Sequence, residues 1–321
     1  MTTTLTTAHS QQLTTGQKFG VEILAGQVAE STANMYKRDF GAYAEFAGSF
    51  ANALQPETLA QWRAHLANET TKSPNTINRM LSAVRKLMTE AASQGYTSHE
   101  TADAFQRVAG VKVTAMKSRT KPNAKVWLEP EQMREICDAP DTSSLAGKMH
   151  KALLHTMATT GVRVAEIVGM KMSDISLSNK DGRIGYIVMV AGKNKAEPTA
   201  RSMGAGAYNA ICEWLAARDK ETGVKSDYIF TGTRGNGGSR EASSTPIHTV
   251  SAWEIVKRYA AAVGLDMQNV KPHDFRRFVA EQLGEKHGIK KAQTQLGHAN
   301  IATTAQYMRD KPVLGGTDDL F

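Results

Sequence analysis

The sequence predicts a mainly α-helical protein of two domains, the second of which contains a small antiparallel β-sheet. Apolar residues recur three or four positions apart through residues 17–110, whereas β-branched residues alternate over 183–190. The length of 321 residues also exceeds one typical domain of roughly 100–200 residues. We therefore expect a helical region at 17–110, a linker at 111–125 and a mixed α and β region at 126–310.

The charge balance favours a polyanionic partner. Thirty-nine Lys and Arg residues oppose 31 Asp and Glu residues, and the resulting net charge of +8 suits nucleic acid. A hydrophobic fraction of 41% excludes global disorder. No apolar run reaches the roughly 20 residues that span a bilayer, so we expect a cytoplasmic protein without a membrane partner. Cys137 and Cys212 lack metal-ligand spacing, which predicts free thiols and no metal site.

Start signals and apolar stripes predict four or five helices in the first region. Ser31-Thr32 is expected to cap one helix, Pro56 to open the next, and Ser73-Pro74 to cap a third. The stripes expected to face a core are Tyr36, Phe40, Tyr43 and Phe46 on the first helix, Leu59, Trp62 and Leu66 on the second, and Ile77, Leu81, Val84 and Met88 on the third.

Basic residues without acidic neighbours point to DNA contacts. No acidic residue occurs between Asp103 and Glu129, a stretch that contains Arg107, Lys112, Lys117, Arg119, Lys121 and Lys125. A linker that crosses DNA phosphates needs such one-signed charge, whereas a merely solvated linker does not. On the third helix, the cations outside the stripe are Arg79, Arg85 and Lys86. They fit either a solvated surface or contacts to the DNA backbone.

The second region combines helices with a hairpin. Helices are expected over 128–136, 145–160 and 205–218, and a β-hairpin from 183–190 and about 197–203. The segment 231–244 is rich in Gly and Ser, so we expect a mobile loop there. Its two cations, Arg234 and Arg240, are further candidates for DNA contact.

Four separated motifs contain chemically useful side chains. They are Arg163 with Glu166 in "TTGVRVAEIVGMKMSDI", Lys193 with Lys195 in "GKNKAEP", His273 with Arg276 in "KPHDFRRF", and His298 with Tyr307 in "QLGHANIATTAQYM". Each alone has an ordinary explanation, such as a surface ion pair, a polar turn, a structural histidine or a packed tyrosine. Together they supply two guanidiniums, a lysine, two histidines and a hydroxyl, which suits cleavage of a phosphodiester.

With these motifs the sequence resembles the tyrosine recombinase, or phage integrase, family, and "GVRVAEIVGMKMSDISL" is especially similar to Xer-type recombinases. The resemblance covers about residues 20–310. It implies a helical core-binding domain and a catalytic domain that close on DNA as a C-shaped clamp. It also implies DNA cleavage and rejoining through a 3′-phosphotyrosyl link, with strand exchange between two duplexes and without metal, ATP or another cofactor.

The resemblance also implies a role for each site residue. Tyr307 would attack the phosphate and His273 would take its proton. The phosphate oxygens would be held by Arg163, Arg276 and His298, while Glu166 would orient the arginine or histidine. Lys193 would protonate the leaving oxygen. Two departures from the family pattern are Arg277, where the family often has histidine, and a hairpin one residue shorter, which keeps Lys195 as an alternative acid.

The implied partners are a double-stranded DNA recombination site and a homotetramer, with accessory proteins or a partner recombinase left open. The sequence also leaves open whether the task is dimer resolution, plasmid maintenance, or integration and excision of a mobile element. Two alternative functions are type IB topoisomerase-like relaxation and DNA binding without cleavage. We expect a flexible tail at 1–16, and the tail at 311–321 either docks on a neighbouring copy or is disordered.

Overall fold

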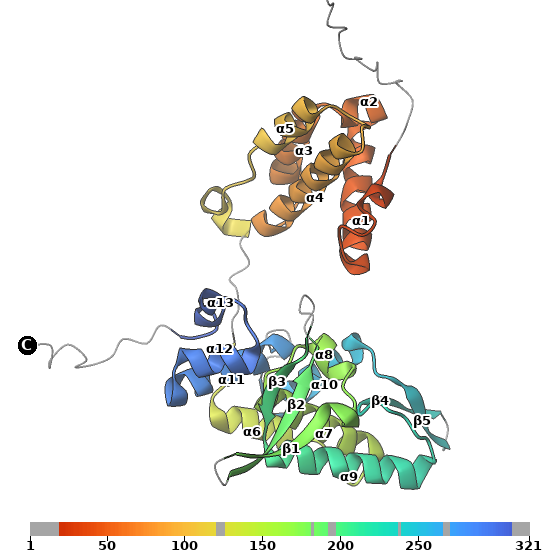
Figure 1. Ribbon diagram of the computed structural model, residues 1–321, viewed down its shortest axis with the longest axis vertical. Coiled ribbons are helices and arrows are strands. Elements are labelled where there is room, and N and C mark those ends of the chain that lie inside the picture. Colours follow the sequence, from red (N-terminus) through yellow and green to blue (C-terminus); the bar gives the residue numbers. More distant parts are fainter. Residues whose placement is uncertain are drawn as a thin grey trace, which may run out of the picture. The chain divides into compact units, whose positions relative to one another are not determined.

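Figure 1 shows a computed structural model of the chain, which divides into two compact units, Met1–Ala124 and Lys125–Phe321. The structure describes residues 19–119, 126–180, 183–191, 197–236, 239–265 and 270–309, and within these it leaves the side chains of 180, 183–184, 234–236 and 239–243 undescribed. The expected tails at 1–16 and 311–321 lie outside the described residues, as do Lys121, Lys193 and Lys195.

The first unit is helical, as the sequence predicts. Its elements are η1 (Val21–Leu24), α1 (Glu30–Ala47), α2 (Phe50–Ala53), α3 (Pro56–Glu69), α4 (Pro74–Ser93), α5 (His99–Arg107) and η2 (Val113–Arg119). The start of α4 is fixed by the Ser73 hydroxyl, which accepts a hydrogen bond from the Thr76 amide at 3.3 Å. The predicted apolar stripes of α3 and α4 are fully buried, and Trp62 packs against Tyr43 with ring centroids 5.2 Å apart.

Two expectations for α1 are wrong. The helix begins at Glu30 with Ala29 as its N-cap, so Ser31 and Thr32 lie in its first turn instead of capping it. The backbone of Ala29 is already extended there, and Glu30 places a carboxylate at the positive end of the helix. Phe46 is 38% exposed and contacts the ring of His65 instead of the core.

The region expected to be an irregular linker is partly folded. Val113–Arg119 forms the short helix η2, and Met116 packs against the core of the first unit. The preceding chain is held by Asn78 of α4, whose side chain donates to the carbonyl of Val111 at 3.0 Å and accepts from its amide at 2.8 Å. Part of the basic stretch therefore belongs to the surface of the first unit.

The second unit mixes helices with two small sheets. Its helices are α6 (Pro130–Asp138), α7 (Leu145–Thr160), α8 (Val164–Val168), η3 (Met172–Asp174), α9 (Ala205–Thr222), α10 (Thr249–Ala262), α11 (Pro272–His287), α12 (Ile289–Leu296) and α13 (Ile301–Ala305). Its strands are β1 (Ile175–Lys180), β2 (Arg183–Val190), β3 (Thr199–Met203), β4 (Thr231–Asn236) and β5 (Ser239–Pro246). The core is built around α7, and the buried indole of Trp214 donates to the Ile229 carbonyl at 2.7 Å.

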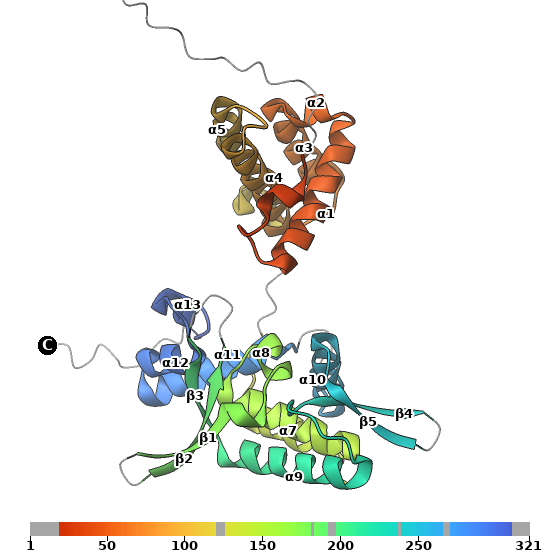
Figure 2. The same cartoon turned by 45° about the vertical axis from the view of Figure 1, so that its right-hand side comes forward.

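The main sheet is antiparallel with the order β1-β2-β3. The predicted hairpin is confirmed by the pairing of Tyr186 with Met203 and of Val190 with Thr199, whereas β1 was not expected. α12 lies beside β3, with α11 and α13 packed against α12, while β4 and β5 project from another part of the unit (Figures 1 and 2).

The Gly- and Ser-rich segment is not a loop. β4 and β5 pair as an antiparallel hairpin, with Gly235 opposite Arg240 and Arg234 opposite Glu241. Composition suggested a loop because Gly and Ser have low strand propensity, but paired backbone hydrogen bonds override that weak preference here. In the part of the chain that the structure describes, no helix is long and apolar enough to cross a membrane.

Candidate active site

Tyr307 and His273 form the centre of the site. Tyr307 follows α13, where its amide donates to the Thr304 carbonyl at 2.9 Å. His273 is the second residue of α11, which begins at Pro272. These two elements bring the Tyr307 hydroxyl to 2.5 Å from Nε2 of His273, with the ring centroids 5.2 Å apart. The pair predicted from two separate motifs is therefore in direct hydrogen-bond contact.

The surroundings keep His273 neutral. Burial lowers the pKa of His273 below its ordinary value of 6.5, and the nearby guanidiniums of Arg276, Arg277 and Arg163 lower it further. A neutral imidazole has one unprotonated ring nitrogen. If Nε2 is that nitrogen, His273 accepts the hydroxyl proton of Tyr307, which is the arrangement that a general base needs.

Arg276 is a buried guanidinium that joins two helix ends. It is 1% exposed and donates through Nη1 to the carbonyl of Gly161 and through Nη2 to that of Leu296, each at 2.6 Å. Gly161 ends α7 and Leu296 is the last residue of α12, so Arg276 satisfies carbonyls at the negative ends of two helices. Burial and the charges of Arg163 and Arg201 lower the pKa of Arg276 to about 10, which leaves it cationic at neutral pH.

Arg163 is positioned by Glu166. Gly161 ends α7 in a left-handed conformation, with φ of 63°, and Arg163 is the N-cap of the short helix α8. The Glu166 carboxylate accepts from both the backbone amide and Nη1 of Arg163, at 2.8 Å in each case. The Arg163 side chain is 44% exposed, whereas that of Glu166 is 8% exposed. The ion pair predicted from their spacing therefore holds an accessible guanidinium on a buried carboxylate.

The ring of His298 also lies close to the ring of Tyr307. Its ring centroid lies 5.2 Å from that of Tyr307. Nδ1 of His298 is 2.9 Å from the Thr304 hydroxyl, and the buried Nε2 has no hydrogen-bond partner in the described structure. Burial and the charges of Arg276, Arg163 and Arg201 lower the pKa of His298 to about 4. A neutral His298 that accepts from Thr304 at Nδ1 has its proton on Nε2, ready to donate to an anion.

Three further residues of the site were missed from the sequence. Thr304 touches His298, and Arg201 and Gln295 lie buried between β3 and α12. Thr304 and Gln295 give no recognisable signal in the sequence. Arg201 does give one, because strand alternation puts it on the same side as the buried Met203. Over the described ranges, no group of three or more His, Cys, Asp or Glu side chains could hold a metal ion.

The three helix cations predicted as DNA contacts have partners within the first unit. Arg79 forms an ion pair with the buried Asp39, and Arg85 donates to the carbonyl of Val108. Lys86 lies 4.0 Å from Glu90 one turn later on α4. The side chains of Arg79 and Lys86 are 36% and 38% exposed, so their ion pairs leave both accessible at the surface.

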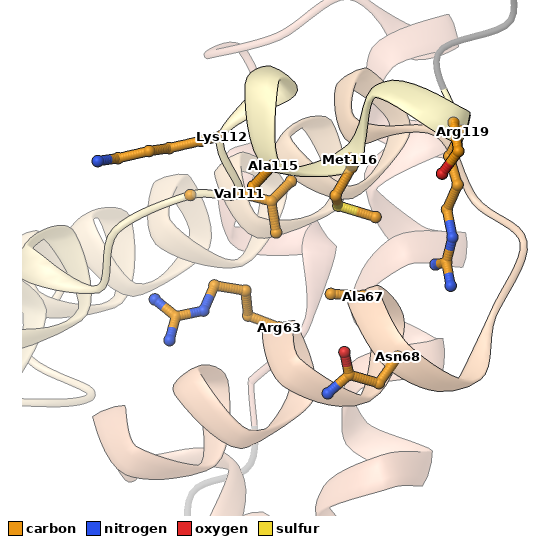
Figure 3. Close-up of a pocket in the computed structure, with 10 residues that line it drawn as sticks. Arg63, Ala67, Asn68, Val111, Lys112, Ala115, Met116 and Arg119 are labelled. Atoms are coloured by element: carbon orange, nitrogen blue, oxygen red, sulfur yellow. The ribbon is translucent and has the colours of Figure 1, made fainter.

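A basic hollow lies between α3 and the η2 segment (Figure 3). It has a volume of about 460 Å³ and is lined in part by Arg63, Asn68, Lys112 and Arg119. Figure 3 shows Arg119 reaching across the hollow toward Asn68, while Lys112 extends outward at its rim. None of the described lining residues is acidic, and Nη1 of Arg119 is buried without a described hydrogen-bond partner.

For the remaining predicted DNA-contact residues, the structure gives the element in which each lies. Lys117 lies in η2, and Arg234 and Arg240 have described backbone in β4 and β5 but undescribed side chains. The structure brings together Arg163, Glu166, His273, Arg276, His298 and Tyr307 through the contacts and charge effects given above.

Two family models match the chain. The sequence model of the Phage integrase family matches residues 126–312, and that of the phage integrase N-terminal SAM-like domain matches 22–95. The chain is 28% identical over 288 residues to tyrosine recombinase XerC of Corynebacterium glutamicum, which covers 89% of this chain and 83% of the relative.

Two solved structures share the fold. XerH site-specific recombinase bound to a palindromic difH substrate, in a post-cleavage complex, has a TM-score of 0.67 and 21% identity, covering 88% of this chain and 77% of that one. A lambda integrase tetramer bound to a Holliday junction has a TM-score of 0.60 and 19% identity, covering 92% and 78%. In both structures, the shared fold consists of a helical first domain followed by a second domain that mixes helices and strands.

Proposed function

The chain belongs to the phage integrase family and is a site-specific tyrosine recombinase, and from this premise we propose that Tyr307 is the nucleophile that cleaves DNA. The observation that carries the assignment is the 2.5 Å contact between its hydroxyl and Nε2 of His273. We further propose that residues 17–110 form the helical DNA-binding domain, 111–125 the linker and 126–310 the catalytic domain. The clamp around DNA stays a prediction.

The first chemical step starts with Tyr307. Its hydroxyl oxygen attacks the scissile phosphorus while the proton passes to Nε2 of His273. The new bond joins the tyrosine oxygen to phosphorus, and the bond that breaks joins phosphorus to the 5′-oxygen. A free tyrosine has a pKa near 10, so a neutral histidine in contact is needed to accept the proton during attack. The lowered pKa of His273 supports this role.

The negative charge that develops on the phosphate is met by two donors and a buried cation. Arg163 presents an exposed guanidinium, Arg276 provides a fixed buried cation, and His298 provides the unpartnered Nε2. Arginine stays ionised and has forked donors that match phosphate oxygens. Because Glu166 and two helix ends fix the arginines before DNA binds, little reorganisation is needed in the transition state.

The departing 5′-oxygen needs a proton. We assign that proton to Lys193, with Lys195 as the alternative, because both residues lie in the sequence between β2 and β3. The freed 5′-hydroxyl of one duplex then attacks the phosphotyrosine of the partner duplex. That attack reforms a phosphodiester and returns the hydroxyl to Tyr307. One phosphodiester is formed for each one broken, so the bond energy is conserved during strand exchange.

The first unit supplies a surface for the DNA backbone. In the basic hollow, no described carboxylate pairs with Arg63, Lys112 or Arg119, and Nη1 of Arg63 donates to the carbonyl of Ala109 at 3.0 Å. Phosphate contacts of this kind supply affinity that does not depend on base sequence. We propose that the hollow and Lys117, together with Lys121 farther along the linker, contact phosphates, and that Lys86 does so from α4.

The proposed assembly is a homotetramer on two DNA sites, as in the lambda integrase tetramer on a Holliday junction. We propose that this assembly acts in the cytoplasm, where its DNA substrates lie.

Covalent capture tests the proposed function. Fragmented genomic DNA of the host is incubated with tagged protein, denatured with detergent, and recovered through the tag. Wild type should retain a defined set of DNA sequences, and Tyr307→Phe should retain none while binding the same sequences in a gel-shift assay. Equal recovery by Tyr307→Phe would contradict the assignment. Joint products from two captured duplexes distinguish strand exchange from relaxation of one supercoiled duplex.

A further inference from the structure

Arg201 is a buried arginine that the proposed chemistry does not use. Its side chain is 1% exposed, although it lies on β3 at the edge of the main sheet. Nη1 donates to the carbonyl of Gln295 at 2.7 Å, and Nη2 lies 3.8 Å from the Glu166 carboxylate. Burying a charged group costs free energy. The groups that are bonded to the buried guanidinium therefore indicate its role.

Arg201 and Arg276 bind neighbouring carbonyls at the end of α12. Arg201 donates to the carbonyl of Gln295, and Arg276 donates to the carbonyl of Leu296. These carbonyls have no partner within the helix, and they lie at its negative end. Both guanidiniums therefore fix the turn that leads directly from α12 to His298.

The backbone of that turn lies directly against Arg201. Gly297 has a left-handed φ of 64°, and a Cβ built there would be 2.8 Å from Nη2 of Arg201. Only glycine fits both the conformation and the close approach. The guanidinium of Arg201 thus supports the residue immediately before His298.

Gln295 ties the same turn to β3 in a second way. Its side-chain amide donates to the carbonyls of Ser202 at 2.8 Å and Thr160 at 3.1 Å, and its oxygen accepts from the Ser202 amide at 2.9 Å. β3, α7 and α12 are consequently linked through buried polar contacts. β3 is also the strand that follows the turn containing Lys193 and Lys195.

The charges around Arg201 fit the proposed reaction. Arg163, Arg201 and Arg276 carry three positive charges against the single negative charge of Glu166, so these four groups sum to +2. A phosphodiester with one negative charge gains a second from an attacking tyrosinate. The buried third arginine thus offsets the charge of the carboxylate that positions Arg163.

We infer that Arg201 is a positioning residue for the recombination reaction, whose buried guanidinium fixes Glu166 and the Gln295–His298 turn and thereby aligns Arg163 and His298 on the scissile phosphate. The inference rests on the proposed function of those residues. We assign no DNA contact to Arg201, because its guanidinium faces the Gln295 carbonyl and the Glu166 carboxylate. Its loss should impair cleavage far more than DNA binding.

The test compares Arg201→Met and Arg201→Lys with a matched control, Arg218→Met. Arg218 is another buried arginine of the second unit, and it donates to the carbonyl of Tyr228 at 2.9 Å without contacting a proposed site residue. The assay measures covalent adduct formed at saturating protein on a duplex that wild type captures, beside Kd for the uncut duplex and the melting temperature. The Tyr307→Phe variant gives the background.

Arg201→Met should lower the adduct-forming rate about 10- to 100-fold with Kd changed less than about twofold, because misplacing reacting groups by an ångström has effects of that size. Arg201→Lys keeps the charge but loses the fork, so it should recover part of that rate. Arg218→Met should lower the melting temperature without lowering the rate. If Arg201→Met does not fold, the rate of Arg201→Lys at unchanged Kd decides the question.

A second readout separates positioning from stability. NMR titration of His298 should show a higher pKa in Arg201→Met than in wild type, because Arg201 is one of the cations beside it, together with Arg276 and Arg163. Arg218→Met should not change it. Wild-type rates in both Arg201 variants would overturn this inference alone, whereas absence of adduct from wild type itself would overturn the proposed function and the inference together.

Discussion

The hydroxyl of Tyr307 lies 2.5 Å from Nε2 of His273, although 34 residues separate them in the chain. Their contact depends on the start of α11 for the histidine and on the turn after α13 for the tyrosine. This contact supports the proposed roles of Tyr307 as nucleophile and His273 as base, and it leads to predictions about pH and about the residues that support the pair.

The pH dependence of cleavage should reflect neutral histidines. Burial and neighbouring arginines hold the pKa of His273 below 6.5, and that of His298 is about 4. Both groups are therefore neutral above pH 6.5, and cleavage should persist as the pH falls through 6.5 and be lost only when His273 becomes protonated at lower pH. The pH at which the rate falls is measured from single-turnover adduct formation across about pH 4.5–8, a range that includes the pH at which histidine titrates. A midpoint above 6.5 would contradict the account.

Replacing His273 should slow attack without weakening DNA binding. We expect His273→Gln to lower the adduct-forming rate about 100-fold or more, which is the usual contribution of a general base. The fall in cleavage rate at low pH should be absent from the pH profile of this variant, because no imidazole is left to titrate at position 273. His287→Gln changes an exposed histidine at the end of α11 and serves as the control. Equal rates in the two variants would remove His273 from the mechanism.

Thr304 should matter through its hydroxyl alone. Thr304→Val keeps the shape of the side chain but cannot donate to Nδ1 of His298, so Nε2 is no longer held as the donor to phosphate. We expect the cleavage rate to fall about tenfold, the equivalent of a hydrogen bond worth about 1.4 kcal/mol. Thr304→Ser keeps the hydroxyl and should retain most of the rate. The proposed tautomer is wrong if Thr304→Val cleaves like wild type.

The general acid can be identified with a substrate that does not need one. In a duplex with sulfur in place of the scissile 5′-oxygen, the leaving thiolate is stable without a proton. Lys193→Ala should therefore cleave ordinary DNA slowly and the sulfur-containing duplex at the wild-type rate. Lys195→Ala should cleave both at the wild-type rate. The reverse pattern would make Lys195 the acid, and slow cleavage of both substrates by both variants would exclude each lysine from that role.

The basic hollow should contribute to affinity in a salt-dependent way. Arg63→Gln and Arg119→Gln should each lower the slope of log K against log salt concentration by about 0.9, because each releases one phosphate contact. Neither should change the adduct-forming rate at saturating protein. Fluorescence anisotropy at several salt concentrations measures the slope, and Lys220→Gln at the end of α9 serves as the control. An unchanged slope in both arginine variants would show that the hollow does not bind phosphate.

The sequence was sufficient where local pattern decides the structure. Period and capping signals predicted α4, because Ser73 caps it and residues such as Ile77 and Leu81 face the core. The bounds of α7 and β2 also agree with the predicted ranges. The pairing of Arg163 with Glu166 followed from a spacing that the N-terminal turn of α8 brings together.

Long-range contacts account for what the sequence did not predict. The roles of Arg201 and Thr304 depend on α12 packing against β3 and on α13 packing against α12, which no local pattern encodes. The β4–β5 hairpin forms from Gly and Ser residues because strand pairing outweighs their propensity. The ion pair of Arg79 with Asp39 joins two different helices. Charge alone does not reveal such a partner.

The most direct test of the central claim is to locate the protein–DNA bond. The adduct that wild type forms with a captured duplex is digested with protease and nuclease, and the modified peptide is sequenced by mass spectrometry. The account predicts a nucleotide joined through its 3′-phosphate to Tyr307 and to no other residue. A nucleotide attached to any other side chain would contradict the assignment of Tyr307 as the nucleophile.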